Sequence, residues 1–271
     1  MLILRTSDQI RDGDICVIGQ GIPMIAGAIA KRKHAPHAII LTEAGMLDIN
    51  PFENLDDVAD PGSSKGFSCA MGLYDVFGTI VNRNFADLAF LGALQVDKYG
   101  NINTTVIGNY FLKNRSDIRF AGSGGSNEFM GHCKQTVITI VGGKFVKKLD
   151  YITSPGWLSG GNSRQKAGLP GGPECLISKY GLFKFHDESK EMYLCELFPE
   201  TELEDIQEEI PWKIKTAEDF GESIHKLDPP SKADLKFIRE FDAIFGIGGH
   251  EGRRLESQAL PVYYEGGRAN K

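Results

Sequence analysis

The sequence has no long hydrophobic run and no closely paired cysteines. Its N-terminal apolar run, residues 2–4, ends at Arg5, so we expect neither a secretory signal nor a transmembrane helix. The five cysteines are widely spaced and none forms a CxxC pair, which disfavours both a zinc site and a disulfide framework. We therefore expect a cytoplasmic protein without a bound metal, in which most cysteines are buried as small apolar side chains.

An excess of positive charge is also missing. Lys and Arg total 30 against 36 for Asp and Glu, which gives a formal net charge of −6 and an isoelectric point of about 5.6. This balance argues against nucleic-acid binding and against a basic protein of the membrane surface. With 41% hydrophobic and 24% charged residues, the chain has the composition of a globular protein. Its 271 residues allow one large domain or two small ones.

The common nucleotide-binding motifs are absent. The chain contains no GxxxxGK[ST] phosphate loop, and the turn Gly19-Gln20-Gly21 is not a GxGxxG fingerprint because Met24 stands where the third glycine belongs. Backbone N–H groups of Gln20 and Gly21, at the expected start of a helix, are suited to bind an anion. A tight strand-to-helix turn explains the same residues equally well.

Short apolar runs alternate with a helical segment in the first third of the chain. Residues 15–18 and 38–41 are typical of buried strands, and residues 24–33, after Pro23, are typical of a helix with a basic end. This strand–helix–strand order predicts an α/β fold with a parallel-rich sheet flanked by helices. We expect one domain over residues 1–245 and a polar, Gly-rich tail over 246–271. Further expected elements are a loop over 50–72, a helix over 71–82, strands over 88–91 and 137–141, a meander over 175–178, 181–185 and 192–195, and a helix over 232–241.

Glu43 is the first candidate for chemistry. It directly follows the expected strand 38–41, and ligands of parallel α/β sheets bind outside the carboxyl ends of the strands. A poorly solvated carboxylate there can act as a nucleophile or a general base. Ala44 and Gly45 after it leave room for a bulky group. The alternative is an ordinary solvated loop glutamate.

Two glycine positions are candidates for backbone contacts at the same edge. Gly92 follows the strand 88–91 and can present an N–H to an oxyanion, or it can simply be a close-packed glycine at a strand end. The run 122–127, Gly-Ser-Gly-Gly-Ser-Asn, is suited to a hinge, a phosphate nest or a subunit contact, and a flexible loop is its default interpretation. The convergence of Gly19, Glu43 and Gly92 on one sheet edge favours a single domain.

Several motifs in order resemble the β subunits of family I CoA-transferases. They are residues 19–23 (GQGIP), 42–45 (TEAG) and 92–101 (GALQVDKYGN). Residues 120–127, 149–157, 168–171 and 180–185 are similar to the glutaconate CoA-transferase type in particular. The resemblance spans about residues 13–241, and several ordered motifs carry more weight than any one of them.

The resemblance implies a ping-pong transfer of CoA between an acyl-CoA and a short carboxylic or dicarboxylic acid such as glutaconate. Glu43 would be the nucleophile, passing through a glutamyl anhydride and a glutamyl-CoA thioester. The N–H of Gly92 would stabilise the oxyanions, and Gln20, Gly21 and Gly45 would contact the substrate. Coenzyme A is a substrate in this scheme, and neither a metal nor a permanently bound cofactor is needed.

The resemblance also implies a partner, a separate α subunit that completes a hetero-oligomer and part of the pocket. Two alternatives stay open. One is a CoA-ester hydrolase or decarboxylase on the same scaffold. Relatives of that kind lack the glutamate, whereas this chain retains it as Glu43. The other is a non-catalytic binding subunit.

Overall fold

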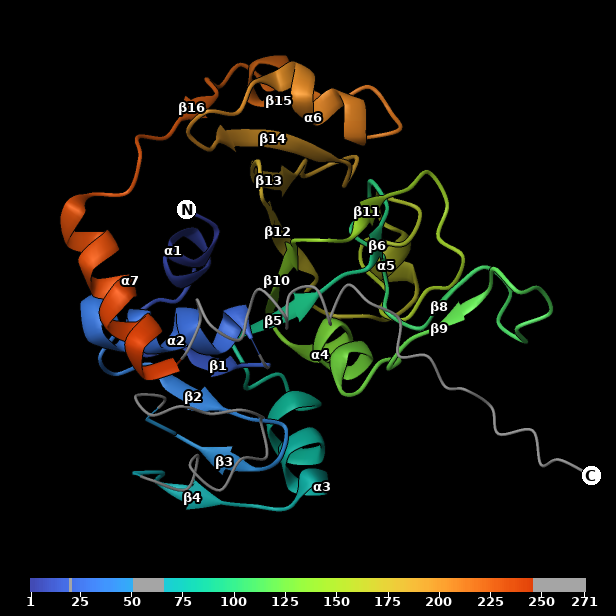
Figure 1. Cartoon of the computed structure of the whole chain (residues 1–271). Helices are drawn as coiled ribbons and strands as arrows, with labels where there is room; N and C mark the ends of the chain where they lie inside the picture. Colours follow the sequence, from blue (N-terminus) through green and yellow to red (C-terminus); the bar gives the residue numbers. More distant parts are fainter. Residues whose placement is uncertain (20, 51–65, 246–271) are drawn as a thin grey trace, which may run out of the picture.

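The computed structural model describes residues 1–19, 21–50 and 66–245 (Figure 1). Gln20 and the expected tail from residue 246 lie outside these residues, and so does most of the loop expected over 50–72. Among the described residues no helix is long and apolar enough to cross a membrane.

The first strand–helix–strand unit forms as the sequence predicts. Strand β1 (Ile15–Val17) leads through the glycine turn into helix α2 (Ile22–Lys33) and returns as strand β2 (Ile39–Leu41), parallel to β1. Pro23 occupies the first turn of α2, where its missing N–H costs nothing. Three basic residues fill the last turn, next to the negative end of the helix dipole.

The main sheet has a parallel centre and margins that contain antiparallel pairs, although β15 and β16 pair parallel to β14. Within the described residues its eleven strands run in the order β15-β14-β13-β12-β10-β5-β1-β2-β3-β4, with β16 also paired to β14. The pairs from β12 to β2 are all parallel, which confirms the predicted parallel-rich sheet. The margins include the predicted meander, in which β13 pairs antiparallel to both β12 and β14. The remaining bounds are β3 Met46–Leu47, β4 Cys69–Ala70, β5 Leu88–Gly92, β10 Gln135–Ile140, β12 Pro173–Ser178, β13 Gly181–Phe185, β14 Met192–Leu197, β15 Lys215–Thr216 and β16 His225–Lys226.

Helices cover both faces of the parallel strands. Helices α1 (Leu2–Ser7), α2 and α7 (Lys232–Phe245) pack together on one side, and helix α4 (Ser126–His132) lies on the other with α3 (Leu73–Asp75) and its continuation η2 (Val76–Val81) (Figure 1). Neighbouring residues of one strand therefore enter different cores, as Leu91 and Phe90 do in β5. Burial on both faces explains why these strands are continuous apolar runs rather than alternating patterns.

Smaller elements differ from the sequence-based expectations. The expected helix over 71–82 is a single α-turn, α3, that continues as the π-helix η2. The expected loop over 50–72 is wrong at its end, where Cys69–Ala70 forms the marginal strand β4. Four of the five cysteines are buried, as predicted, and Cys69 is exposed. Elements that were not predicted include α1, a second sheet of β6 (Gln95–Val96), β7 (Ile102–Asn103) and β11 (Lys144–Phe145), the pair β8 (Val106–Ile107) and β9 (Ile118–Arg119), α5 (Ser163–Lys166), α6 (Leu203–Glu209) and the 3-10 helix η3 (Ala217–Phe220).

Candidate active site

Three neighbouring parallel strands bring the candidate residues to one edge of the sheet. The register pairs Val17 of β1 with Leu41 of β2 and with Ala89 of β5, so the three strands end at the same edge. Glu43 follows β2 by two residues, and Gly92 is the last residue of β5. The carboxyl edge of the parallel centre is therefore the place where chemistry is expected.

Glu43 lies in a tight turn between β2 and β3. The turn is closed by hydrogen bonds from the N–H of Gly45 to the Thr42 carbonyl (3.1 Å) and from the N–H of Thr42 to the Met46 carbonyl (3.1 Å). Gly45 has φ +105°, and a Cβ there would lie 1.9 Å from the Met71 carbonyl oxygen. The chain after strand β4 thus passes so close to the turn that only glycine fits. This is a structural reason for Gly45, and its predicted contact with substrate stays a prediction.

The carboxylate of Glu43 is half-buried and held by the glycine run 122–127. Its Oε2 accepts a hydrogen bond of 3.1 Å from the N–H of Gly125, the residue that precedes helix α4. Within the described residues Oε1 has no hydrogen-bond partner. One carboxylate oxygen is therefore held by a backbone donor, which orients the side chain.

Stacked aromatic rings form an apolar wall beside this hydrogen bond. The rings of Phe77 and Phe129 lie 5.2 Å apart between centroids, at an interplanar angle of 16°. A Cβ on Gly125 would lie 2.6 Å from the Phe77 ring, 2.8 Å from the Phe129 ring and 2.7 Å from Oε2 of Glu43. The two rings and the carboxylate thus leave no room for a side chain at Gly125.

Gly92 presents its backbone at the open edge of the sheet. The N–H of Ala93 donates to the Thr139 carbonyl (3.2 Å) on the β10 side. Because backbone groups alternate in direction along a strand, the N–H of Gly92 points to the β1 side, beyond the last β1 pair at Ala89. No atom outside its chain neighbours lies within 4 Å of a Cβ built on Gly92, so this position faces open space.

The glycine turn after β1 is only partly described. Gly21 has φ +81° and is the residue that precedes helix α2, where its carbonyl accepts hydrogen bonds from the N–H groups of Met24 (3.0 Å) and Ile25 (3.3 Å). Gln20 lies outside the described residues. The predicted contacts of Gln20 and Gly21 with substrate stay predictions.

The glycine run 122–127 is better held than its sequence indicates. Gly122 exchanges hydrogen bonds with Thr104, whose hydroxyl donates to the Gly122 carbonyl (2.8 Å) and whose carbonyl accepts from the Gly122 N–H (3.1 Å). The hydroxyl groups of Ser126 and Ser154 lie 2.8 Å apart. Residues 122–125 form a loop and turn, and from Ser126 onward the segment is helix α4, so the interpretation as a loop holds only for the first four residues of the run. The sequence singled out this run but gave no sign that it lies against Glu43, 82 residues earlier.

Two of the buried cysteines are unsuited to act as nucleophiles in place of Glu43. Burial raises the pKa of the Cys133 thiol to about 12 and that of the Cys195 thiol to about 11. Because the thiolate is the reactive form, both thiols are inert near neutral pH. In the part of the chain that the structure describes, no three His, Cys, Asp or Glu side chains are grouped so that they could hold a metal ion.

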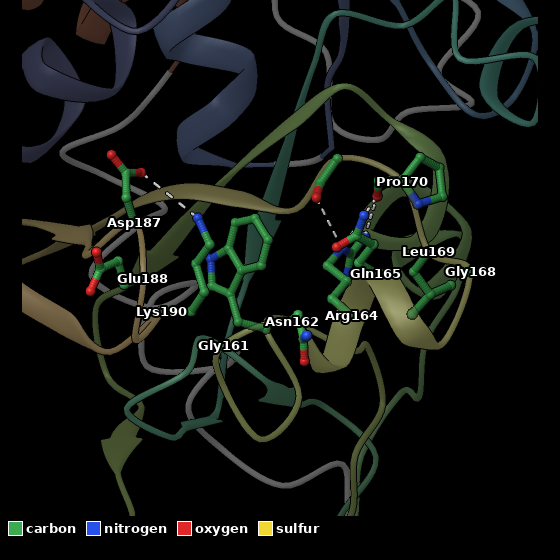
Figure 2. A pocket seen from close by; sticks show the side chains of 12 residues that line it. Gly161, Asn162, Arg164, Gln165, Gly168, Leu169, Pro170, Asp187, Glu188 and Lys190 are labelled. Carbon is green, nitrogen blue, oxygen red and sulfur yellow. Dashed lines mark hydrogen bonds and ion pairs between the residues drawn. The ribbon is translucent and has the colours of Figure 1, made fainter.

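A separate cavity of about 570 Å³ lies beside helix α5 (Figure 2). Its lining includes Trp157, Arg164, the loop 168–171 and Lys190, whose ammonium group lies 4.5 Å from the centroid of the Trp157 ring. Neither Glu43 nor Gly92 lines it. The cavity is therefore not the site of the candidate nucleophile, although Arg164 connects the two regions through helix α4.

Comparisons with known proteins bear on the family of this chain. The sequence model of the family "Coenzyme A transferase" matches residues 1–209. A subunit of glutaconate CoA-transferase from Acidaminococcus fermentans is 34% identical over 248 residues, which cover 89% of this chain and 90% of the relative. A subunit of 3-oxoadipate CoA-transferase from Pseudomonas knackmussii is 30% identical over 246 residues, with coverage of 90% and 92%.

Solved structures show the same fold. The crystal structure of glutaconate coenzyme A-transferase from Acidaminococcus fermentans matches with a TM-score of 0.80 and 32% identity, covering 90% of this chain and 95% of that one. The decarboxylase AibA/AibB matches with a TM-score of 0.72, over 93% and 95% of the chains, but at 22% identity it supports the fold alone. The family resemblance that the motifs indicated is thereby confirmed: the chain belongs to the coenzyme A transferase family.

Proposed function

We propose that this chain is the catalytic subunit of an acyl-CoA:carboxylate CoA-transferase and that Glu43 is the nucleophile. One observation carries the proposal. At the carboxyl edge of the parallel strands, one oxygen of Glu43 is held by the Gly125 N–H while the other has no partner among the described residues. A carboxylate held in this way is oriented before the substrate arrives.

The proposed reaction conserves the energy of the thioester through covalent intermediates. Oε1 of Glu43 attacks the thioester carbonyl, the C–S bond breaks, and an acyl-glutamyl anhydride and CoA thiolate form. The thiolate then attacks the glutamyl carbonyl, which releases the first carboxylate and leaves a glutamyl-CoA thioester. A second carboxylate reverses the two steps and leaves as the new acyl-CoA. The reaction needs neither a proton donor nor a phosphate compound such as ATP.

Each addition passes through an oxyanion that needs hydrogen-bond donors in place. When the thiolate attacks the glutamyl carbonyl, the charge develops on the Glu43 oxygen that already accepts from the Gly125 N–H. When the carboxylate attacks the substrate, the charge develops on the substrate oxygen instead. The Gly92 N–H, which points beyond the end of the β1 ladder, is our candidate donor for that oxyanion, with the turn at Gln20 and Gly21 second.

The proposed acceptor is a short dicarboxylic acid, and glutaconate is the first to test. The two relatives compared by sequence are named for glutaconate and 3-oxoadipate, both of which are short dicarboxylates. The second carboxylate of such an acid needs a cation or further N–H donors.

A mass measurement tests the covalent route. We expect that incubating the two-subunit enzyme with acyl-CoA, without acceptor acid, adds the mass of CoA to the peptide that contains Glu43. Borohydride, which reduces a thioester to an alcohol, should convert that glutamate and prevent further transfer. Peptides with other glutamates, such as Glu204, should stay unmodified. A non-catalytic binding subunit would give no adduct under any condition, whereas a hydrolase would release free CoA and acid continuously without an acceptor.

An exposed aromatic surface supports the proposed second subunit, as do the names of both relatives, each of which is one subunit of its enzyme. Five large apolar side chains around the β8–β9 pair are exposed to solvent, and we call them the aromatic platform: Tyr110 (42%), Phe111 (77%), Leu112 (47%), Tyr151 (38%) and Ile152 (53%). The Tyr110 ring stacks on Tyr151 at 5.3 Å, and the Arg119 guanidinium lies 4.1 Å from its centroid. In Figure 1 the β8–β9 pair projects from the body of the molecule on the α4 side. A contiguous exposed apolar patch of this kind is typical of a subunit interface.

The platform makes the subunit contact testable. We expect the double variant Phe111→Ser and Tyr151→Ser to lower co-purification of the second subunit at least tenfold, since buried aromatic anchors dominate binding energy at interfaces. The matched control is Phe85→Ser, because Phe85 is 60% exposed but precedes strand β5 of the main sheet and is not part of the platform. Equal recovery of the second subunit with both variants would contradict the assignment of the platform.

A further inference from the structure

Arg164 is a buried cation without a carboxylate partner among the described residues. It lies on the short helix α5 and is 1% exposed. Its Nη1 donates to the carbonyls of Pro155 (2.6 Å) and Gly156 (2.9 Å). Its Nε donates to the carbonyls of Pro170 (3.2 Å) and Gly171 (3.0 Å), and Nη2 donates to Pro170 (2.7 Å) and Met130; Figure 2 shows the guanidinium beside the loop that carries Pro170. Buried arginines are usually paired with an acidic side chain. Arg164 instead donates to five backbone carbonyls, and this arrangement needs an explanation.

The carbonyls that Arg164 binds belong to three separate segments. They come from residues 155–156, from residues 170–171 and from the last turn of helix α4. The Met130 carbonyl has no helical donor, because the N–H four residues later, that of Lys134, donates to the Ala86 carbonyl instead. The guanidinium supplies the missing donor and places its charge at the negative end of α4.

Helix α4 connects this guanidinium to the nucleophile. At its other end the Gly125 N–H donates to Glu43, and the Gly125 carbonyl accepts the N–H of Phe129 (3.0 Å). Ser154, directly before the Pro155 that Arg164 binds, touches the same end of α4 through the hydroxyl of Ser126 (2.8 Å). Segment 154–156 therefore fixes α4 twice, once directly at Ser126 and once through Arg164 at Met130.

We propose that Arg164 is a positioning residue for Glu43, which it holds in reactive geometry by fixing helix α4 through the Met130 carbonyl. The inference rests on the proposed function of Glu43 and goes beyond it by naming what fixes the donor. The space around Gly125 makes the position of α4 critical. A Cβ there would come within 2.8 Å of Glu43, Phe77 and Phe129, so a small tilt of α4 either lengthens the N–H···O bond or forces contact with a ring. Displacements of about 1 Å at a reacting group can cost on the order of a hundredfold in rate.

Two variants of Arg164 in the two-subunit enzyme test the proposal. Arg164→Lys keeps a cation but cannot reach five carbonyls, and we expect kcat to fall about tenfold to a hundredfold while KM changes less than about threefold. We expect kcat to fall further in Arg164→Ala. Because the cavity of about 570 Å³ borders Arg164, guanidinium ion or ethylguanidinium at millimolar concentration can enter the vacated space, and we expect it to restore kcat at least tenfold. Butylammonium, of similar size but without the planar fork, should not.

Controls separate positioning from general stability and from failure of the proposed function. Ile206→Ala removes a fully buried side chain of helix α6, and we expect it to lower the melting temperature without changing kcat. Formation of the CoA adduct on Glu43 in the unaltered enzyme tests the proposed function; the rate of that formation in the Arg164 variants tests this inference. If Arg164→Ala does not fold, Arg164→Lys carries the test alone. An unchanged kcat for Arg164→Lys, or a loss that guanidinium fails to restore in folded Arg164→Ala, overturns the proposal.

Discussion

Replacing Glu43 with Gln should reduce CoA transfer by at least about 10⁴-fold, because the covalent route disappears when the nucleophile does. The amide oxygen of Gln can still accept the Gly125 N–H that now binds Oε2, so the turn and helix α4 should keep their places. The loss would then report chemistry rather than folding. Glu43→Asp keeps the charge but draws the carboxylate back from Gly125 by one methylene, and we expect an intermediate loss.

The measurement is kcat with saturating acyl-CoA and acceptor acid, together with the melting temperature of each variant. Glu204→Gln is the matched control, because Glu204 is an exposed residue of helix α6 and the substitution is chemically identical. We expect that control to behave as the unaltered enzyme does. Near-normal transfer by Glu43→Gln would contradict the assignment of Glu43 as the nucleophile. The alternative of a non-catalytic binding subunit would then have to be considered again.

The sequence predicts the parallel centre of the fold because local patterns determine it. Each strand of the first unit is a short apolar run that ends at a glycine or a turn, and helix α2 carries Pro23 at its start and basic residues at its end. Burial on both faces leaves no alternation to read, so the order of elements is the signal that indicates parallel strands. The same logic places Glu43 and Gly92 at one edge.

Elements without a long period escape such prediction. Helix α1 has six residues, and the strands of the second sheet have two each, which is too short for periodicity to appear. The contact between Glu43 and Gly125 spans 82 residues and depends on where α4 packs, not on any local motif. The role of Arg164 could not be predicted for a similar reason. Every residue has a backbone carbonyl, so the amino-acid sequence does not show which carbonyls bind the guanidinium. Both sets of contacts depend on how distant segments pack together, and no local sequence pattern predicts them.

Gly125→Ala should lower kcat by about a hundredfold to a thousandfold, the usual cost of losing one oxyanion donor. The backbone of Gly125, at φ −83° and ψ 0°, is open to alanine, so the effect does not come from backbone strain. It comes from the added methyl group, which would lie 2.7 Å from Oε2 of Glu43 and 2.6 Å from the Phe77 ring. Neither neighbour can stay in place, so the carboxylate or helix α4 must shift, and the Gly125 N–H no longer reaches Glu43.

Gly131→Ala is a control on the same helix for this substitution. No atom apart from the helix's own backbone and its chain neighbours lies within 4 Å of a Cβ at Gly131, so alanine fits there without displacing anything. Because alanine costs less entropy than glycine in a helix, we expect a gain of about 0.5 kcal/mol in the free energy of unfolding and no change in kcat. Melting curves and the rate of CoA adduct formation on Glu43 would be compared for both variants. If Gly125→Ala formed the adduct as fast as Gly131→Ala, the Gly125 N–H would have no part in the reaction, and the hydrogen bond to Glu43 would be a feature of the resting enzyme alone.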